Sequence, residues 1–576
     1  MHDVEADTDA AWADWEHAST LPASELLAQE GIVPLGHDRG TFYYLSQASR
    51  QVVALTADRH SRNTLMAMAS LAHYWQRSRF ISPKGIVQWE DATDWLMCQC
   101  REVGIFDPDR LRGRGAWIDN KRAVLHLGDK LIVDGDPVPI NTFSSRFIYE
   151  QARTLPVDIA PEAMSAAQSK RLMDLCIAAP WEDPESMGRL LAGWCVIAPV
   201  CGAMPWRPHL WITSEAGGGK SWILDNIIRA LLGSIAVFAQ SKTSEAGLRG
   251  ELGIDARPVV FDEFETQNDA DRARVQQVLD LARQASSETG ADILKGTQTG
   301  GVRRYRIRSC FAFSSITLGL TQAADESRTV ILPLKTDPDQ AKRQEHFTKL
   351  KSLHAEVMTP EFAGALLTRT LRLLPIIRYN AETFAQAIAR SGSSRRAGDT
   401  LGVLLAGAWS LRSNLVATAA QADDFIGQKG GWVKSALSRN ETEAEWKRAI
   451  GHLVQQMIRI TNGNGRSEDV PVGELIAVAT GQTAANHPIQ PSDAVTSLTR
   501  SGIKVQFDGN VRFVAIANTS SVVAGWFSRT AWAAGWLATL ARAPGTRPSG
   551  KTVAFGAHRS RALILPIACV LGTDDG

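Results

Sequence analysis

The feature that most constrains this chain is a glycine-rich segment of eight residues, Ser214-Glu215-Ala216-Gly217-Gly218-Gly219-Lys220-Ser221. It follows a short apolar stretch, residues 209–213, and precedes residues 221–232, whose apolar side chains recur at helical spacing. A strand, a glycine-rich loop and a helix in this order form the setting of a phosphate-binding loop. Its backbone N–H groups and the helix N-terminus would surround phosphate oxygens, Lys220 would reach the β and γ phosphates, and Ser221 would bind Mg²⁺. The segment therefore predicts a site for ATP or another nucleoside triphosphate.

One position departs from this pattern. The motif ordinarily begins with glycine, and Ser214 stands there instead. Taken alone, the segment could also be an ordinary glycine-rich turn. Motifs that follow in the chain favour the phosphate-binding interpretation.

The first of these is a buried type of strand, residues 257–263, that ends in two carboxylates. Hydrolysis of a phosphoanhydride needs one carboxylate to hold hydrated Mg²⁺ and another to polarise the attacking water. We assign Asp262 to the metal and Glu263 to the water. The alternative is an acidic strand end before a turn, but the order of the two motifs favours nucleotide hydrolysis.

A second motif is a β-hairpin with a basic returning strand, formed by residues 292–296 and 302–308 around a tip rich in glycine and threonine. Strand alternation predicts that Arg304, Arg306 and Arg308 share one face of the returning strand. Cations beside an aromatic ring suit a single-stranded nucleic acid, whereas a solvated edge strand is the alternative. We favour DNA, with four candidate contacts: Arg303, Arg304, Tyr305 and Arg306.

Two further positions are candidates for contacts with the γ-phosphate. Residues 310–316 form a strand that ends in hydroxyl groups, and the choice between Ser314 and Ser315 as a phosphate sensor stays open. Arg328 directly precedes another apolar strand and could stabilise the transferring phosphate across a subunit boundary. A surface ion pair with an acidic neighbour at 325 or 326 is the alternative for Arg328.

Composition excludes several classes of protein. The 576 residues carry a formal net charge of +1, so any contact with DNA has to come from local patches. The seven cysteines are scattered and predict reduced thiols in a cytosolic protein, and the acidic N-terminus lacks the pattern of a secretory signal. The longest uncharged run, residues 190–206, contains two prolines and predicts a buried helix rather than a membrane span. We therefore expect no membrane partner.

The predicted fold class is α/β, with a P-loop core flanked by other domains. The expected divisions are an N-terminal α+β domain, a helical connector, the core, a helical lid and a winged-helix-like domain, at residues 1–150, 151–205, 206–340, 341–430 and 431–576. The last assignment rests on two helices followed by a hairpin with an Asp-Gly turn signal at Asp508-Gly509.

Smaller elements are predicted within these parts. The N-terminal part should contain a helix over residues 64–75 and a small antiparallel meander over 117–133, and the helical lid should be broken by a loop at 391–399. The segment Arg112-Gly113-Arg114-Gly115 is either a contact to nucleic acid or a subunit, or a flexible solvated loop. We favour the flexible loop.

With these motifs in order, residues 206–335 resemble the superfamily 3 helicases. More closely, the chain is similar to the helicase part of the phage and poxvirus-type primase-helicases. The resemblance is carried by the glycine-rich loop, the paired acids, the basic hairpin, the polar-ended strand and the trailing arginine. It also extends to four short segments, residues 112–117, 243–250, 258–263 and 294–297.

The resemblance implies an AAA+-like fold, a ring of six subunits and ATP-driven translocation on single-stranded DNA. It places the protein in the replication of a phage or other mobile element, in the cytoplasm of a bacterial host, with a primase or replication-initiation protein as partner. Lys295 matches the family's DNA-gripping lysine, and Arg328 matches its arginine finger. The serines at 314 and 315 depart from the family, which commonly has a sensor asparagine there.

Two other functions are weighed against a helicase. One is an NTP-dependent switch or loader ATPase without unwinding activity, and the other is a non-catalytic DNA-binding protein built around the C-terminal part. The adjacent acids at 262 and 263 favour turnover over binding alone. Residues 1–150 contain no polymerising or zinc motif, so any primase activity is expected on another polypeptide or an upstream part.

Overall fold

The chain forms two compact units, residues 1–441 and 442–576. The structure is a computed structural model that describes residues 31–71, 74–265, 269–287, 293–296, 302–320, 322–427, 445–461, 467–481, 489–508, 511–530 and 532–572.

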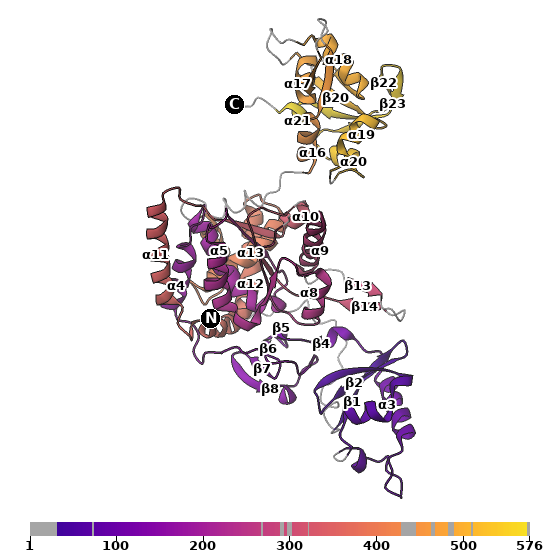
Figure 1. The fold of residues 1–576 in the computed structure, drawn as a ribbon, viewed down its shortest axis with the longest axis vertical. Helices are drawn as coiled ribbons and strands as arrows, with labels where there is room; N and C mark the ends of the chain where they lie inside the picture. Colours follow the sequence, from indigo (N-terminus) through magenta and orange to yellow (C-terminus); the bar gives the residue numbers. More distant parts are fainter. Residues whose placement is uncertain are drawn as a thin grey trace. The chain divides into compact units, whose positions relative to one another are not determined.

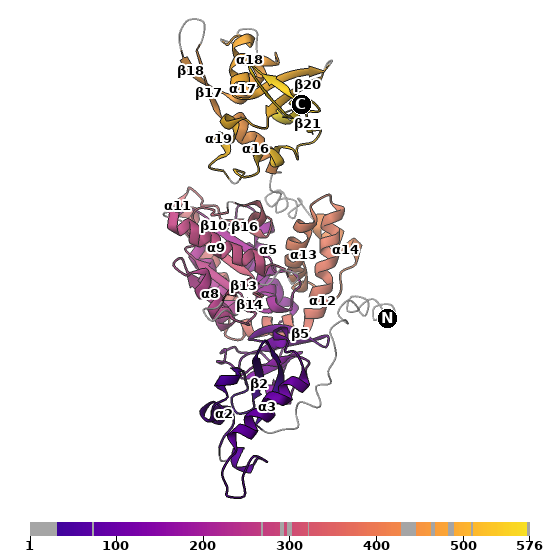
Figure 2. The same ribbon diagram turned by 90° about the vertical axis from the view of Figure 1, so that its right-hand side faces the viewer.

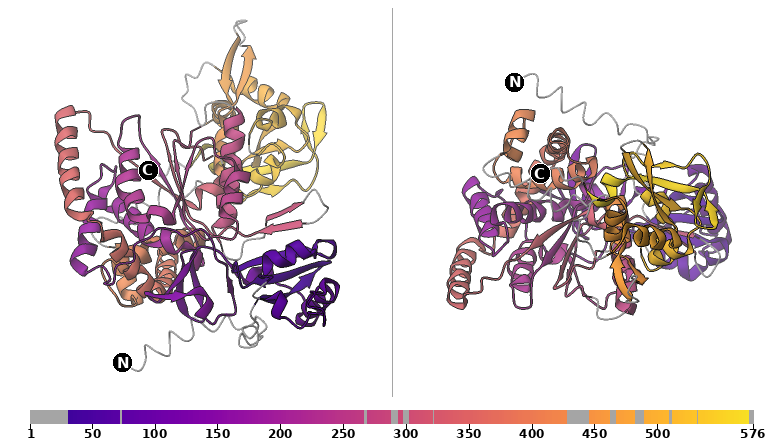
Figure 3. Two further views of the ribbon diagram at one scale, coloured as in Figure 1. Left: turned by 60° about the horizontal axis from the view of Figure 1, so that its bottom comes forward. Right: turned by 90° about the horizontal axis from the view of Figure 1, so that it is seen from above.

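The first unit is built around a five-stranded parallel sheet, so a mixed α/β architecture is confirmed (Figures 1 and 3). In chain order its strands are β10 (His209–Thr213), β11 (Val237–Gln240), β12 (Val259–Asp262), β15 (Phe311–Ser315) and β16 (Thr329–Pro333). In space the order is β11-β12-β15-β10-β16. The strand before the glycine-rich loop therefore lies inside the sheet, between β15 and the edge strand β16, and β15 separates it from the strand that ends in Asp262.

The sheet is stable because both of its faces are apolar. Leu210 and Ile212 of β10 belong to the largest apolar cluster, whereas Trp211 belongs to a second cluster with Phe261 and Phe313. Successive side chains of a strand point to opposite faces, so the two clusters cover the two sides of the sheet. Helix α9 (Asp269–Ala285) covers the second cluster, and helix α5 (Pro184–Ile197) contributes to the first.

Helices make up the rest of this unit's main body. They include α4 (Ala166–Ile177), α8 (Glu245–Leu252), α11 (Gln340–Val357), α12 (Phe362–Arg390), α13 (Arg395–Ser410) and α14 (Ala419–Gly427), of which the last three lie side by side in Figure 2. The predicted helix after the glycine-rich loop is present as α6 (Lys220–Ile223), a π-helical segment (Leu224–Arg229) and α7 (Ala230–Leu232).

Two helical regions differ in how well they match the sequence predictions. The only stretch of the described residues that is apolar and long enough to span a membrane, Pro184–Ala203, has 89% of its apolar window buried inside the protein, as expected for a core helix. The loop predicted over 391–399 is wrong at its end, because α13 begins at Arg395. The Ser394 side chain caps that helix by accepting a hydrogen bond from the Ala397 N–H.

The N-terminal part of this unit contains two antiparallel sheets. One consists of β1 (Ile32–Asp38), β2 (Thr41–Ser46) and β3 (Gln51–Thr56), with helix α3 (Trp89–Val103) packed on β1. The other consists of β5 (Gly115–Asp119), β6 (Arg122–His126), β7 (Lys130–Val133) and β8 (Asp136–Pro139), which confirms the predicted meander.

The helix predicted over residues 64–75 is shorter than expected. Helix α2 covers Arg62–Met68 only. Trp75 is fully buried, and its indole N–H donates a hydrogen bond to the Leu65 carbonyl at 3.1 Å. The chain therefore turns back onto α2, because burying the tryptophan against that helix outweighs the local preference for a longer one.

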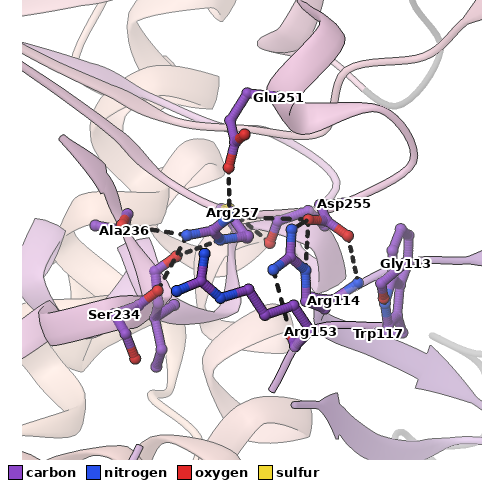
Figure 4. A network of polar contacts seen from close by, with 12 residues as sticks. Gly113, Arg114, Trp117, Arg153, Ser234, Ala236, Glu251, Asp255 and Arg257 are labelled. Carbon is purple, nitrogen blue, oxygen red and sulfur yellow. Dashed lines mark hydrogen bonds and ion pairs between the residues drawn. The ribbon is translucent and has the colours of Figure 1, made fainter. Parts of the chain in front are cut away.

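The expectation of a flexible loop at Arg112–Gly115 is wrong, because this segment is fixed to the core (Figure 4). The Arg114 guanidinium pairs with the Asp255 carboxylate at 2.6 Å, and the Arg114 backbone N–H donates to the same carboxylate at 2.7 Å. Gly115 has φ +118°, and a Cβ there would lie 2.2 Å from the Ala256 carbonyl oxygen. The glycine is therefore needed for the close approach of two backbones.

Asp255 also connects this segment to the start of β12. The guanidinium of Arg257 lies 3.9 Å from the Asp255 carboxylate and 3.4 Å from Glu251, and it donates to the carbonyls of Ile235 and Ser234. The side chains of Asp255 and Arg257 are each 8% exposed. A buried charge network thus joins the N-terminal part to the central sheet.

The second unit is a smaller α/β assembly with its own apolar core. Its helices are α16 (Glu445–Val454), α17 (Val472–Ala479), α18 (Pro491–Arg500), α19 (Ser521–Phe527), α20 (Trp536–Leu540) and α21 (Ile567–Leu571). Its sheet has the order β19-β20-β24-β21, from β19 (Ile503–Asp508), β20 (Val511–Ala517), β24 (Ala562–Pro566) and β21 (Arg547–Pro548). Hairpins form from β17 (Met457–Thr461) with β18 (Ser467–Pro471) and from β22 (Val553–Phe555) with β23 (His558–Ser560). The predicted order of two helices and a hairpin is present as α17, α18 and β19–β20, and its turn residue Gly509 lies outside the described residues.

We expect Asp255→Ala to destabilise the protein by about 3–5 kcal/mol, because it leaves two buried guanidinium groups without their shared carboxylate. The free energy of unfolding in urea measures this effect. Asp423→Ala is the matched control, since it removes a carboxylate from an ion pair with Arg390 whose side chains are about half exposed, and it should cost less than about 1 kcal/mol. Equal losses in the two variants would contradict a structural role for the network.

Candidate nucleotide-binding site

The glycine-rich loop lies between the end of β10 and the first residue of α6. Gly217 and Gly219 have φ values of +75° and +98°, a region that favours glycine. The Gly218 N–H donates to the Glu215 carbonyl at 3.1 Å and closes the turn. Residues Glu215 to Gly217 of the loop are exposed, and so is Ser221, the second residue of the helix. The backbone therefore has the curvature that the sequence predicts for a phosphate-binding loop.

The Lys220 ammonium is held by its own loop. Its Nζ donates to the carbonyls of Ser214 at 2.9 Å and Glu215 at 3.2 Å, and to the Ser214 hydroxyl at 3.2 Å. Burial lowers the pKa of Lys220, and the carboxylates of Glu265 and Asp262 oppose that shift. The hydrogen bonds of the Lys220 ammonium are therefore to oxygens of its own loop.

The serine at the first position of the loop has a defined place. Its side chain is buried, and its hydroxyl donates to the Glu215 carbonyl at 2.9 Å. A Cβ on Gly218 would lie 2.5 Å from this hydroxyl, so glycine at 218 makes room for serine at 214. The departure from the usual motif thus adds one hydrogen-bond partner for Lys220 and leaves the loop's shape intact.

The acids at the end of β12 differ in burial, since Asp262 is half-buried and Glu263 is exposed. Asp262 is the last residue of the strand, and its carboxylate accepts a hydrogen bond from the Glu263 N–H at 3.0 Å. Glu263 is exposed and has φ +53°, which is uncommon for a residue with a side chain. Such strained positions persist only where the surrounding structure imposes them.

The turn at Glu263 is imposed by the residue that follows it. Phe264 is buried between Trp211 and Phe313, with ring centroids 5.6 and 4.6 Å away. Its N–H also donates to the Ser314 carbonyl at 2.7 Å. Burial of this ring brings the next side chain, Glu265, back toward the sheet edge.

Glu265 is a site residue that sequence reasoning missed. Its carboxylate accepts a hydrogen bond from the Ile316 N–H at 2.9 Å, just past the end of β15. Its charge, with that of Asp262, opposes the lowering of the Lys220 pKa by burial. The sequence contains one signal for this arrangement, the apolar residue 264 between acids at 263 and 265. A phenylalanine at this position indicates that the chain turns to bury the ring, so the two acids are not part of one solvated run.

The two serines at the end of β15 differ in what their hydroxyls contact. Both are fully buried. The Ser315 hydroxyl accepts from the Trp211 indole N–H at 2.7 Å and donates to the Thr317 carbonyl at 2.6 Å. Within the part of the chain that the structure describes, the Ser314 hydroxyl has no hydrogen-bond partner. Ser314 therefore differs from Ser315 in having a buried hydroxyl that no described group satisfies.

Arg328 lies at the opposite edge of the sheet from the loop. In the parallel pairing of β10 with β16, His209 pairs with Thr329 and Thr213 with Pro333, so the loop and Arg328 are at opposite strand ends. The Arg328 guanidinium donates to the Ala324 carbonyl at 2.6 Å and to the Ser286 hydroxyl at 3.2 Å.

The surroundings of Arg328 are cationic. Burial, followed by the charges of Arg396 and Arg283, lowers the pKa of Arg328 to about 10. Of the two acids considered as surface partners, Asp325 is nearly fully buried and pairs with Arg283 at 3.5 Å. Because it also lies at the strand end opposite the loop, Arg328 cannot reach the loop of its own chain.

The predicted basic hairpin is present as β13 (Ile293–Gly296) and β14 (Val302–Tyr305), and Lys295 pairs in register with Arg303. The side chains from Ile293 to Tyr305, including those of Arg304 and Tyr305, lie outside the described residues. Figures 1 and 3 show the two strands extending from the main body of the first unit.

The prediction that Arg304, Arg306 and Arg308 share a strand face is wrong, because β14 ends at Tyr305. Arg306 pairs with Asp109 of the N-terminal part at 3.1 Å. Arg308 is buried, with its guanidinium 5.4 Å from the Trp117 ring centroid. The base of the hairpin is therefore anchored to the N-terminal part of the chain.

Mg²⁺ would fit this site only together with phosphate oxygens. Among the described residues, no group of three or more His, Cys, Asp or Glu side chains is placed to hold a metal ion. Mg²⁺ in nucleotide sites usually takes one or two protein oxygens, with phosphate and water as the other ligands. Ser221 and Asp262 supply oxygens of that kind.

No protein-family model matches the chain, and no curated protein matches it. Among solved structures, the chain is similar to SCCmec type IV Cch, an active helicase, with a TM-score of 0.42 and 13% sequence identity. The alignment covers 94% of this chain and 95% of that chain. At this TM-score the likeness is too remote to assign an activity, which has to be inferred from the site itself.

We expect Ser214→Gly to tighten the binding of a nucleoside triphosphate by about two- to tenfold, because Lys220 loses one of the partners that compete with phosphate. The expected size is that of one hydrogen bond, about 0.5–1.5 kcal/mol. Titration with a fluorescent ATP analogue measures the change, and Lys220→Ala serves as the control that should abolish the effect. Weaker binding in Ser214→Gly would show that the hydroxyl contacts the ligand directly.

Proposed function

We propose that the chain is an ATP-dependent DNA helicase. The observation that carries this proposal is that the strands before Lys220, Asp262 and Glu265 run parallel and end at one edge of the sheet, where Glu265 also bonds to the end of β15. β15 lies between the two strands that supply them and brings the Ser314 hydroxyl to the same edge. A cation, acids and a free hydroxyl beside a phosphate-binding loop are the groups that phosphoryl transfer to water requires.

Each residue has a part in this proposal. The loop N–H groups and Lys220 bind the phosphates, and Ser314 senses the γ-phosphate. Ser221 and Asp262 would hold Mg²⁺, which neutralises charge on the phosphate oxygens. Glu263 polarises the attacking water, since its carboxylate is exposed beside Asp262.

Glu265 is proposed as a positioning residue. Its hydrogen bond to the Ile316 N–H joins the acidic loop after β12 to the end of β15. β12 and β15 are already paired in the sheet, so the bond fixes the acidic loop that follows Asp262 relative to the end of the strand that carries Ser314. Its negative charge also favours the charged form of Lys220.

The proposal extends to DNA and to assembly. We place single-stranded DNA on the β13–β14 hairpin, with Lys295 as its main contact and Arg303, Arg304 and Tyr305 beside it. Arg306, predicted with them, is instead paired with Asp109 at the base of the hairpin. Because Arg328 lies at the sheet edge remote from its own loop, it can act as an arginine finger only on the nucleotide of a neighbouring subunit. A ring of six subunits would provide that arrangement.

The wider setting belongs to the same proposal. The protein would act in the replication of a phage or other mobile element in the cytoplasm of a bacterial host, with a primase or replication-initiation protein as partner. The division at 150, 205, 340 and 430 into an α+β domain, connector, P-loop core, lid and winged-helix-like domain is proposed on the same footing.

The proposed role of Glu265 predicts different effects for two substitutions. Glu265→Gln keeps an oxygen that can accept from the Ile316 N–H, whereas Glu265→Ala loses it. We expect Glu265→Ala to lower the kcat of ATP hydrolysis by about tenfold or more, because this factor corresponds to the free energy of one charge-assisted hydrogen bond. Glu265→Gln should retain most of the activity. Steady-state kinetics that separate kcat from KM measure this, with Glu263→Gln as the variant that should lose hydrolysis and keep binding. Equal loss in the two Glu265 variants would contradict the positioning role.

Strand displacement with 3′- and 5′-tailed substrates, with and without ATP, tests the helicase proposal. We expect displacement only with ATP and only for one tail polarity, and none in Lys220→Ala. Lys295→Ala should abolish DNA-stimulated ATP hydrolysis and unwinding while nucleotide binding persists, because it removes a proposed DNA contact away from the loop. ATP hydrolysis without displacement would favour the switch or loader ATPase, and unchanged displacement in Lys295→Ala would overturn the hairpin assignment.

A further inference from the structure

The C-terminal unit contains a long segment of one charge sign. Residues 509–573 contain no aspartate or glutamate, and their seven charged side chains are Arg512, Arg529, Arg542, Arg547, Lys551, Arg559 and Arg561. The whole chain is almost neutral, with a net charge of +1, so this segment is a local departure from its average. Uncompensated like charges repel one another and raise the free energy of the folded state unless something binds them.

Four of these cations form what we call the basic band: Arg547, Lys551, Arg559 and Arg561. All four are exposed. In the part of the chain that the structure describes, none of them forms an ion pair. Some exposed arginines of the first unit do, such as Arg122 with Asp134 and Arg390 with Asp423.

The backbone brings the four residues of the basic band together. In β21 and β24, Arg547 pairs with Ile564, and the Ser549 N–H donates to the Ala562 carbonyl at 2.7 Å. Farther along the same two segments, β22 and β23 pair Ala554 with Arg559. Residues 547–554 and 559–564 therefore run side by side, and all four cations fall on this pair of segments.

The basic band is held rigidly. The Lys504 ammonium of β19 donates to the Ala554 carbonyl at 3.1 Å, and Phe555 is buried against the sheet. The Arg547 guanidinium lies over the Phe513 ring, 5.2 Å from its centroid. Figure 1 shows the β22–β23 hairpin beside β20 and α19 at one side of this unit. The charges are therefore presented on a fixed surface rather than on a loose tail.

Protection of a sheet edge does not account for the basic band. Cations and prolines on edge strands prevent pairing with other chains. The edge strand β21 is only two residues long and already contains Pro548. Arg559 lies in the short strand β23, but Lys551 and Arg561 lie in no strand, so edge protection does not explain these two cations.

The side chains in and around the basic band indicate which kind of polyanion it binds: a single strand, a membrane surface or a duplex. A single strand is usually bound by aromatic side chains that stack on its bases, but the only Phe, Tyr or Trp in residues 542–561 is Phe555, which is buried. A membrane surface would call for apolar side chains to insert, and the large exposed apolar residues of this unit lie elsewhere, at Met457, Val495, Phe507 and Val522. Cations on a rigid surface without stacking or inserting groups match the phosphates of a duplex.

We infer that the basic band of the C-terminal unit binds the phosphate backbone of double-stranded DNA without reading its sequence. This surface is distinct from the β13–β14 hairpin and does not depend on nucleotide. It would hold the protein on duplex DNA whether or not the first unit hydrolyses ATP.

The test uses the full chain, without nucleotide, and fluorescence anisotropy of a labelled blunt-ended duplex at several salt concentrations. The band variant is Arg547→Gln/Lys551→Gln/Arg559→Gln, and the control is Lys447→Gln/Arg459→Gln/Arg500→Gln, which removes three exposed cations of the same unit outside the basic band. Each lost phosphate contact reduces the slope of log K against log salt by about 0.9. We expect the band variant to lose about 2–3 from this slope and about tenfold or more in affinity at low salt. The control should stay close to the unaltered chain.

Additional variants and ligands in the same binding experiment distinguish duplex binding by the basic band from the alternatives. Lys220→Ala should bind duplex like the unaltered chain, so failure of the nucleotide site and failure of the basic band are distinguishable. An unchanged salt slope in the band variant, or an equal loss in the control, would overturn the inference. Loss of single-strand binding alone, or loss of binding to vesicles of anionic lipid with duplex binding intact, would overturn the assignment to duplex DNA. Thermal melting of each variant confirms that the exposed substitutions leave the fold intact.

Discussion

The parallel pairing of β10 with β15 is the interaction on which the candidate site depends. Because parallel strands end at the same edge of a sheet, this pairing places the glycine-rich loop beside Ser314. The next strand, β12, adds Asp262 at that edge. The same parallel arrangement, through β16, puts Arg328 at the opposite edge. One strand order thus determines which predicted residues can meet within a chain and which can meet only between chains.

Much of the central sheet could be predicted from the sequence. Strands such as 209–213 and 311–315 are short apolar runs, and the helix after the loop has a clear apolar period. The glycines at 217 and 219 indicate a backbone with positive φ, and both residues have positive φ in the structure. These local signals are strong because each depends on a few neighbouring residues.

Other features depended on contacts between distant segments. The role of Glu265 comes from the burial of Phe264 against Trp211, about fifty residues away in sequence, which no local pattern contains. The Arg112–Gly115 segment has the composition of a loop, and only its pairing with Asp255 shows that it is fixed. Likewise, strand alternation placed Arg308 with Arg304, whereas the base of the hairpin turns Arg308 into contact with Trp117. In each case tertiary packing outweighed local preference.

The charge network around Asp255 has a consequence for how the chain can be divided. Arg114 comes from the N-terminal part, and Asp255 and Arg257 lie at the start of the strand that ends in Asp262. A shortened chain that began after residue 150 would lack Arg114 and the backbone of Gly115, and would expose charges that are now covered. The N-terminal sheets and the core can therefore be told apart in the sequence, but they fold as one unit. In evolutionary terms, these two parts would have to be inherited or exchanged together.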